Sequence, residues 1–254
     1  MADSRDERPP KGPNDDIFSR PVDRARDFNF GKETAAVFDD MLNRSVPFYN
    51  EIQRQVSELV ADFAAEGTNI YDLGCSTCNT LLAIDETLPP DLDVGYVGID
   101  SSEEMLEEAR HKLDEAGVKR KYVLEHADLN SGVTVMNASV ALMVLTLQFV
   151  RPLYRDRLIN SIYQGLNENG CLILVEKVLG EGSTFNRLFI EHYYEMKRRH
   201  GYSDMEISQK REALENVLIP YRLDENIHLL RKEGFREVDI FFKWYNFCAI
   251  IARK

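Results

Sequence analysis

Apolar residues along the chain follow two alternating spacings. Short apolar runs at 69–73, 93–99, 121–126, 138–145 and 170–175 predict β-strands. Stretches with apolar residues at three- and four-residue steps predict helices between them, at 80–88, 102–116 and 151–166. Strands and helices alternate four times, which is typical of a parallel sheet with helices on both faces. We therefore predict an α/β fold with a doubly wound, mostly parallel sheet.

The C-terminal third departs from this rhythm. Residues from about 183 to 230 have a helical pattern almost throughout, which predicts a helical insertion after the fifth strand. The apolar segments 238–242 and 244–251 that follow predict a closing antiparallel pair of strands. The sheet is therefore expected to be parallel at its centre and antiparallel at one edge.

The N-terminal part is expected to cap the sheet. Aromatic and apolar residues appear from position 17 onward, and residues 49–65 have the pattern of an amphipathic helix, so 17–66 is predicted as a helical cap. Residues 1–16 are charged and rich in Pro and Gly, which predicts a flexible tail. One domain is expected to span 17–254.

Charge and composition narrow the classes of function. The 254 residues contain 31 Lys and Arg against 43 Asp and Glu, and the net charge of −12 disfavours direct nucleic-acid binding. No apolar run approaches the ~18 residues that a membrane span requires, and the polar N-terminus lacks the features of a secretory signal. Four cysteines in a chain of this length do not indicate a disulfide-rich protein. We expect a soluble cytoplasmic protein.

Three aspartates stand at or just after the ends of the first three predicted strands, at equal intervals. Asp72, Asp100 and Asp128 stand 28 residues apart at each step, and the first is followed by a turn that contains Gly74. Ligands of doubly wound sheets bind at the carboxyl ends of the strands, where a glycine lets the backbone approach closely. An acidic residue after the second strand can bind a ribose diol, and one after the third can accept from an adenine amino group. Each aspartate alone could equally cap a helix, so only the set predicts a nucleoside site.

A rival interpretation starts from Cys75 and Cys78, which form a Cys-x-x-Cys motif after the first strand. This spacing occurs in thiol redox pairs and in halves of zinc sites. A zinc site needs a second pair, whereas Cys171 and Cys248 stand alone in apolar strands where core thiols are expected. We therefore predict no metal site. The chain also lacks the glycine patterns of nicotinamide and phosphate-loop sites.

A basic segment stands out in this acidic chain. Lys and Arg concentrate between 197 and 211, which favours attraction of an anionic substrate, although a solvated helix face explains the same pattern. Tyr202 is a candidate ligand contact, and His200 is either a proton shuttle or a structural residue. At the end of the fifth strand, Glu176 and Lys177 are expected either to line a pocket or to pair with each other.

The strand-end pattern resembles the S-adenosyl-L-methionine (AdoMet) site of class I methyltransferase-fold proteins, whose sheet is Rossmann-like. Several strings are more specific: RSVPFY at 44–49, TLQF at 146–149, IYQGLN at 162–167 and EISQKR at 206–211. With these strings, residues 17–254 resemble the carboxy-S-adenosyl-L-methionine (carboxy-AdoMet) synthase family.

The resemblance implies a reaction, an assembly and a set of contacts. Members of that family convert AdoMet and prephenate into carboxy-AdoMet and phenylpyruvate, and a partner tRNA carboxymethyltransferase uses the product on the wobble uridine. They form homodimers. Arg211 is implied as the catalytic residue, which also contacts the ligand by gripping the added carboxylate. The other implied AdoMet contacts are Tyr49, Gly74, Cys75, Ser76, Asp100, Ser101, Asp128, Leu129 and Val144.

Two positions depart from the family pattern. Val144 stands where the family has a pocket asparagine, and Cys78 stands where related sequences often have glycine and is expected to crowd the cofactor turn. Losing one hydrogen bond to a charged ligand lowers affinity about tenfold to a hundredfold. Two alternatives therefore stay open: a conventional AdoMet-dependent methyltransferase acting on a small anionic acceptor, and a non-catalytic AdoMet-binding protein that assists a tRNA-modifying partner. No general base is assigned.

Overall fold

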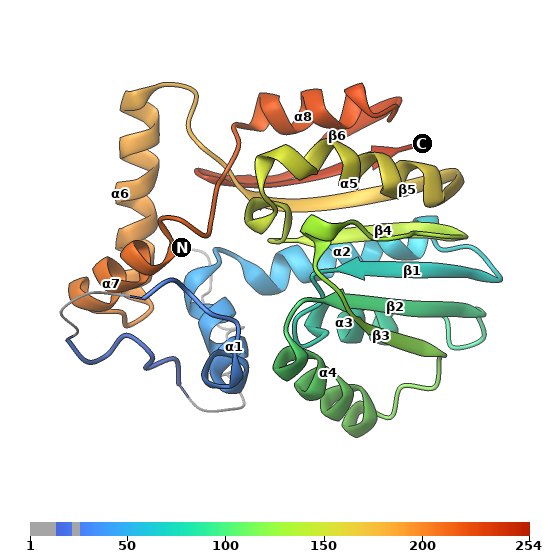
Figure 1. Cartoon of the computed structure of the whole chain (residues 1–254), viewed down its shortest axis with the longest axis horizontal. Coiled ribbons are helices and arrows are strands. Elements are labelled where there is room, and N and C mark those ends of the chain that lie inside the picture. Colours follow the sequence, from blue (N-terminus) through green and yellow to red (C-terminus); the bar gives the residue numbers. More distant parts are fainter. Residues whose placement is uncertain (1–13, 22–25) are drawn as a thin grey trace, which may run out of the picture.

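Seven strands form one sheet at the centre of the computed structural model, which describes residues 14–21 and 26–254 (Figure 1). Their order across the sheet is β3-β2-β1-β4-β5-β7-β6. The first five strands pair in parallel, and β7 runs antiparallel to both β5 and β6. The strands are β1 (Thr68–Leu73), β2 (Val94–Asp100), β3 (Tyr122–His126), β4 (Ala138–Val144), β5 (Leu166–Lys177), β6 (Glu237–Trp244) and β7 (Phe247–Arg253). The predicted doubly wound sheet with an antiparallel edge is confirmed.

Helices cover both faces of the sheet. On one face Ile52, Val56 and Leu81 belong to one apolar core, and on the other Leu158 and Leu230 belong to a second. Full burial of such a side chain contributes about 1.5–3 kcal/mol. The helices are α1 (Lys32–Ser45), α2 (Tyr49–Phe63), α3 (Asn79–Thr87), α4 (Glu103–Ala116), α5 (Pro152–Gly165), α6 (Ser183–Arg199), α7 (Asp204–Leu214) and α8 (Leu223–Lys232), with short 3-10 turns η1 (Leu129–Ser131) and η2 (Leu147–Phe149).

The predicted helix at 102–116 begins and ends as its sequence indicates. The Ser102 side chain accepts a hydrogen bond from the Met105 backbone at 3.2 Å, so it caps the first turn of α4. Gly117 closes the helix in the left-handed conformation, with φ of 67°. The predicted helix at 102–116 is therefore confirmed, with Ser102 as its N-cap.

The closing hairpin differs slightly from the prediction. The last strand was expected to begin at Trp244, but β7 begins at Phe247 and Trp244 is the last residue of β6. Tyr245, with φ of 38°, and Asn246 form the turn between the two strands. An aromatic run with strong strand propensity hid this turn in the sequence.

The helical segment predicted at about 183–230 is not a single insertion. α6 and α7 stand beside the sheet, at the left of Figure 1, whereas α8 packs against α5 and β6 as a regular covering helix. Between α7 and α8 the chain is extended at Arg222, which pairs with Leu179, and Pro220 stops helix formation in this link. The insertion is therefore confined to α6 and α7.

The N-terminal segment before α1 packs against the insertion. The Phe28 backbone donates to the Ala213 carbonyl at 2.9 Å, and the Gln209 side chain donates to the Phe18 carbonyl at 2.8 Å. The predicted tail ended at Asp16, but Asp15 is only 3% exposed, so the packed chain already includes this position. Residues 1–13 of that predicted tail lie outside the described residues. None of the described helices has both the length and the apolar character needed to cross a bilayer.

Candidate functional site

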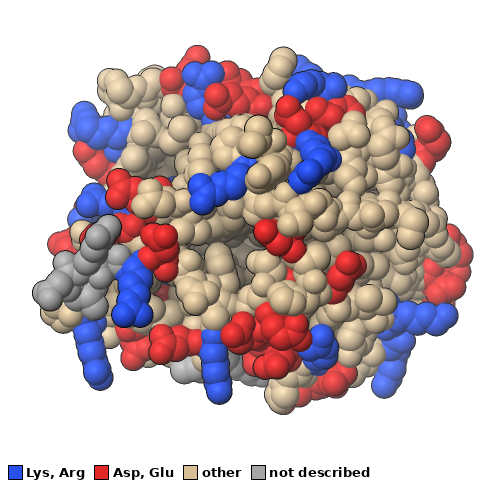
Figure 2. Space-filling view, viewed as in Figure 1, with Lys and Arg blue, Asp and Glu red and all other residues tan. Residues whose placement is uncertain are grey.

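A large pocket opens where the carboxyl ends of the central strands meet α1 and the N-terminal segment. β1 and β4 are neighbours in the sheet although β2 and β3 lie between them in sequence, so the strand order reverses here. Ligands of doubly wound sheets bind at this switch point. Figure 2 shows a hollow near the middle of this face, bordered mainly by uncharged residues, with charges of both signs scattered around it.

Gly74 makes the turn after β1 possible. Its φ is 81°, a conformation that favours glycine, and its backbone donates to the Ile99 carbonyl at 2.7 Å. A Cβ at this position would lie 2.4 Å from the Thr146 side chain. Both the backbone conformation and the close approach of Thr146 therefore require glycine.

Asp100 fixes this turn to the end of β2. One carboxylate oxygen accepts a hydrogen bond from the Ser76 backbone at 2.9 Å, and the other accepts from the Ser102 backbone at 2.9 Å. Each oxygen has a second lone pair, so the carboxylate can still accept from a ligand hydroxyl. Asp128 lines the same pocket and also caps η1 by accepting from Asn130, so the capping and ligand interpretations are compatible at this residue.

Asp72 is the most perturbed carboxyl of the pocket. It lies at the end of β1 and is 2% exposed, and among the described residues no hydrogen-bond donor or cation contacts its carboxylate. Burial, reinforced by the nearby charge of Asp100, raises the pKa of Asp72 to about 7. A cationic ligand in the pocket would compensate this buried charge.

Backbone strain gathers around the pocket. Ser76 and Leu145 both line it and have φ of 47° and 60°, and Phe48, which immediately precedes the lining residue Tyr49, has φ of 53°. Left-handed non-glycine residues cost about 1–3 kcal/mol and persist where the surroundings enforce them, typically at functional sites. Their clustering therefore agrees with a ligand site at this end of the sheet.

Nine of the ten implied ligand contacts come together in this pocket. They are Tyr49, Gly74, Cys75, Ser76, Asp100, Ser101, Asp128, Leu129 and Val144. The tenth, Arg211, is exposed on α7 and borders a separate shallow depression with Tyr194 and Arg198. The preceding residue, Lys210, points into the main pocket instead. Arg211 therefore does not reach the pocket of its own chain.

The two cysteines of the Cys-x-x-Cys motif lie mostly in the core. Cys75 borders the pocket, but Cys78 is fully buried and does not, so the expected crowding of the cofactor turn by Cys78 is not observed. Contact with Cys78 and burial raise the pKa of the Cys75 thiol, which disfavours the nucleophilic thiolate of a redox pair. The described residues also contain no group of three metal-binding side chains.

The residues at the end of β5 face opposite sides of the sheet. Lys177 lines the pocket, whereas Glu176 accepts from the Leu147 backbone at 3.0 Å, so the two do not pair with each other. Burial raises the pKa of Glu176 to about 8, although the guanidinium of Arg155 opposes this shift. Glu176 thus holds the turn before η2, and the alternation of side chains along a strand places only Lys177 in the pocket.

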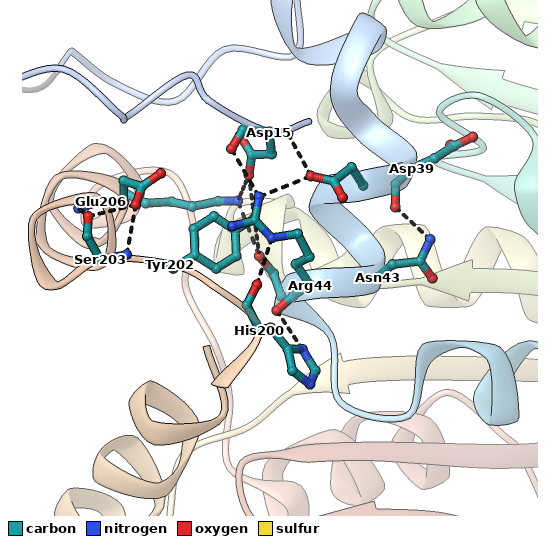
Figure 3. Close-up of polar contacts among 11 residues, drawn as sticks. Asp15, Asp39, Asn43, Arg44, His200, Tyr202, Ser203 and Glu206 are labelled. Carbon is teal, nitrogen blue, oxygen red and sulfur yellow. Dashed lines mark hydrogen bonds and ion pairs between the residues drawn. The ribbon is translucent and has the colours of Figure 1, made fainter. Parts of the chain in front are cut away.

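A polar cluster joins the N-terminal segment, α1 and the link between α6 and α7 (Figure 3). The Tyr202 hydroxyl donates to the Asp15 carboxylate, and the Lys210 ammonium lies 3.2 Å from the same oxygen. The Arg44 guanidinium stacks on the Tyr202 ring at 4.0 Å and donates to the His200 carbonyl. His200 is thus held by Arg44 as a structural residue, and Tyr202 lies behind the pocket wall rather than on it.

Several residues of the pocket were not among the predicted ligand contacts. Phe28 and Phe30 cover the pocket from the N-terminal segment, while Tyr193, Gln148 and Lys210 come from α6, η2 and α7. Aromatic residues before the first helix were the only signal for the cover. The others are distant in sequence, and only the three-dimensional fold brings them to the pocket.

The lining suits AdoMet. At one end, Asp100 and Asp128 can accept from the ribose and the adenine, and the buried Asp72 lies nearby to face a positive group. The remainder of the lining is largely apolar and aromatic, as expected of a site that encloses most of its ligand. The carboxylates of the pocket thus fit a nucleoside that has a positively charged side arm.

Known families agree with this site. A methyltransferase-domain family profile matches residues 70–170. The methyltransferase SibL and a putative AdoMet-dependent methyltransferase from Methanococcus maripaludis superpose with TM-scores of 0.60 and 0.59. The SibL match covers 92% of this chain and 63% of SibL, and the M. maripaludis match covers 90% of this chain and 95% of that protein. Both proteins are only 16% identical to this chain, so they support the fold alone.

Curated relatives are much closer in sequence. The carboxy-S-adenosyl-L-methionine synthase of Methylococcus capsulatus is 56% identical over 94% of this chain and 99% of its own length. The synthase of that name from Nautilia profundicola is 41% identical, again over 94% of this chain and 99% of its own. At this identity and coverage the assignment is unambiguous: the chain belongs to the carboxy-S-adenosyl-L-methionine synthase family.

Proposed function

We propose that this protein converts AdoMet and prephenate into carboxy-AdoMet and phenylpyruvate. The observation that supports this most strongly is the 56% identity, over nearly the full length, to a carboxy-AdoMet synthase. The pocket agrees with it, because aspartates line one end and lysines line the other. The acidic end fits the nucleoside and the positive sulfonium, and the end at Lys177 and Lys210 fits an anionic second substrate.

The pocket would join the two substrates by proximity. AdoMet supplies a methyl group made acidic by the adjacent sulfonium. Prephenate releases its ring carboxylate as carbon dioxide and its hydroxyl as hydroxide, leaving phenylpyruvate. One methyl C–H bond breaks, the new C–C bond forms to carbon dioxide, and the released proton and hydroxide combine as water. Enclosure by Phe28 and Phe30 keeps the carbon dioxide at high effective concentration.

Arg211 requires a second copy of the chain in this proposal. It is the residue expected to grip the new carboxylate, yet it lies outside the pocket of its own chain. A homodimer that brings Arg211 from one protomer to the pocket of the other would supply a bidentate cation for the product. The product would then serve a tRNA carboxymethyltransferase in the cytoplasm, and the net charge of −12 disfavours direct contact of this protein with the tRNA.

Mixed dimers test the origin of Arg211. Arg211→Met lacks the clamp and Asp100→Ala lacks the nucleoside contact, so each variant alone should be inactive. Equal mixing after dissociation should recover about one quarter of the wild-type activity if Arg211 acts across the dimer, because half of the dimers then contain one complete site. No recovery in dimers shown to have exchanged subunits would contradict this arrangement.

The reaction itself is tested with purified protein, AdoMet and prephenate. Mass spectrometry should detect a product heavier than AdoMet by one carbon dioxide, in step with phenylpyruvate formed faster than in the absence of protein. If S-adenosylhomocysteine accumulates instead when small anionic acceptors are added, the protein is a conventional methyltransferase. Binding of AdoMet with no turnover of either kind would favour a non-catalytic partner protein.

A further inference from the structure

Four cations lie in or behind the pocket wall at the end that contains Lys177, and only some of them are paired with carboxylates. Arg44, Lys177, Lys197 and Lys210 gather around the rings of Tyr193 and Tyr202. Arg44 lies 3.1 Å from the Asp40 carboxylate, and Lys210 lies 3.2 Å from that of Asp15. Two of the four cations are therefore paired.

Lys177 and Lys197 form the unpaired half of this group. Within residues 14–21 and 26–254, neither ammonium has an ion pair or a hydrogen bond. Each instead lies over the Tyr193 ring, at 4.8 Å for Lys177 and 5.3 Å for Lys197. A ring face attracts a cation but does not replace an anion.

Only one of these two lysines faces the ligand space. Lys177 lines the pocket, and its backbone is fixed by donation to the Gln148 side chain at 3.0 Å, whereas Lys197 lies behind the wall. Desolvation lowers the pKa of Lys177 to about 8 and that of Lys197 to about 7. An unpaired cation in such a place costs stability, which a bound anion would recover.

The position of Lys177 matches a substrate rather than AdoMet. The nucleoside end is at Asp100, at the tip of β2, and Lys177 is at the tip of β5. In the order β2-β1-β4-β5 these tips are three strand spacings apart, about 14 Å. Lys177 therefore lies well beyond the ribose contact, on the side of the pocket away from the nucleoside.

From this arrangement we propose that Lys177 is the specificity-determining residue for the second substrate, binding the carboxylate that the substrate keeps throughout the reaction. The inference rests on the proposed function, in which one carboxylate of the donor leaves as carbon dioxide and the other remains. A cation on the departing carboxylate would stabilise the ground state more than the transition state, because negative charge flows out of that group as the bond breaks. The retained carboxylate has no such penalty, and it anchors the donor while the reacting end faces AdoMet.

Lys177→Met tests this assignment, because methionine keeps the length and apolar stem of the side chain. We expect the KM for prephenate and the Kd for phenylpyruvate to rise together, by about tenfold to a hundredfold. The Kd for AdoMet should stay within about twofold, and Lys177→Arg should recover part of the affinity. The matched control is Lys121→Met, since Lys121 is exposed and distant from the pocket lining.

Direct binding separates this proposal from the function on which it rests. Titration calorimetry with phenylpyruvate requires no turnover, so it reports on Lys177 even if prephenate is not a substrate. A phenylpyruvate Kd that rises at least about tenfold in both Lys177→Met and Lys177→Gln supports the lysine assignment, whatever the turnover assay shows. Unchanged phenylpyruvate affinity in a folded variant, or no affinity in the wild-type protein, overturns it.

Discussion

Replacement of Gly74 by alanine tests how the AdoMet turn is built. The left-handed backbone at this residue, with φ of 81°, costs an alanine about 1–2 kcal/mol. The new Cβ would also lie 2.4 Å from two atoms of the Thr146 side chain, and overpacking of this kind costs about 1–3 kcal/mol. Together the two effects predict a loss of roughly 2–5 kcal/mol in the free energy of unfolding.

Gly117 provides a matched control for the backbone effect alone. Its φ is 67°, and a Cβ there would meet nothing within 4 Å. Gly117→Ala should therefore lose only the conformational part, about 1–2 kcal/mol, in urea unfolding. Adding Thr146→Ala to Gly74→Ala should recover part of the difference, because it removes the two closest atoms.

Ligand binding adds a second readout for the same variants. Calorimetry should show AdoMet affinity at least about tenfold weaker in Gly74→Ala and unchanged in Gly117→Ala. The reason is that Gly74 borders the pocket and Gly117 does not. Equal losses of stability and equal AdoMet affinity in Gly74→Ala and Gly117→Ala would show that the contact with Thr146 does not shape this turn.

Three further predictions follow from buried polar groups and a helix cap. Burial raises the pKa of Asp72 from 3.8 to about 7. Between these pH values the folded protein keeps a proton on Asp72 that the unfolded chain has lost, so the free energy of unfolding falls as the pH rises. AdoMet affinity should rise with pH over the same window, as Asp72 ionises. In Asp72→Asn, the free energy of unfolding and the AdoMet affinity, measured by urea unfolding and calorimetry, should both depend less on pH. Unchanged slopes in the variant would show that Asp72 does not cause the pH dependence. Arg155→Met should cost roughly 3–5 kcal/mol in urea unfolding, since the buried Arg155 donates to the carbonyls of Val150 and Ile219 and lies near Glu176. A loss below about 1 kcal/mol would show that these carbonyls find other donors. Ser102→Ala should cost about 1 kcal/mol by the same measurement, and a neutral result would mean that the cap contributes nothing.

Much of the sheet and the acidic end of the pocket could be predicted from local sequence patterns. Strand positions follow from apolar periodicity, and parallel strands place their carboxyl ends at one edge, so Asp72, Asp100 and Asp128 were expected to meet. The structure places all three around the pocket. Such residues are predictable because their position depends only on the strand that each one follows.

The cationic end of the pocket depends instead on how α6 and α7 pack. Lys210 meets Asp15 across 195 positions of sequence, and no local pattern encodes that contact. Neighbouring residues of a helix point about 100° apart, so Lys210 faces the pocket while Arg211 faces away. The sequence indicated that this segment is helical and basic, but no local pattern showed which side of the helix faces the pocket.

Isotope labelling tests directly whether the carbon dioxide released from prephenate becomes the new carboxylate on AdoMet. Prephenate labelled with ¹³C at its ring carboxylate should be incubated with the protein and unlabelled AdoMet. The label should appear in the new carboxylate of an AdoMet-derived product, at one label per phenylpyruvate formed. Complete loss of the label to dissolved carbon dioxide, with AdoMet unchanged or demethylated, would show that the protein does not carboxylate AdoMet.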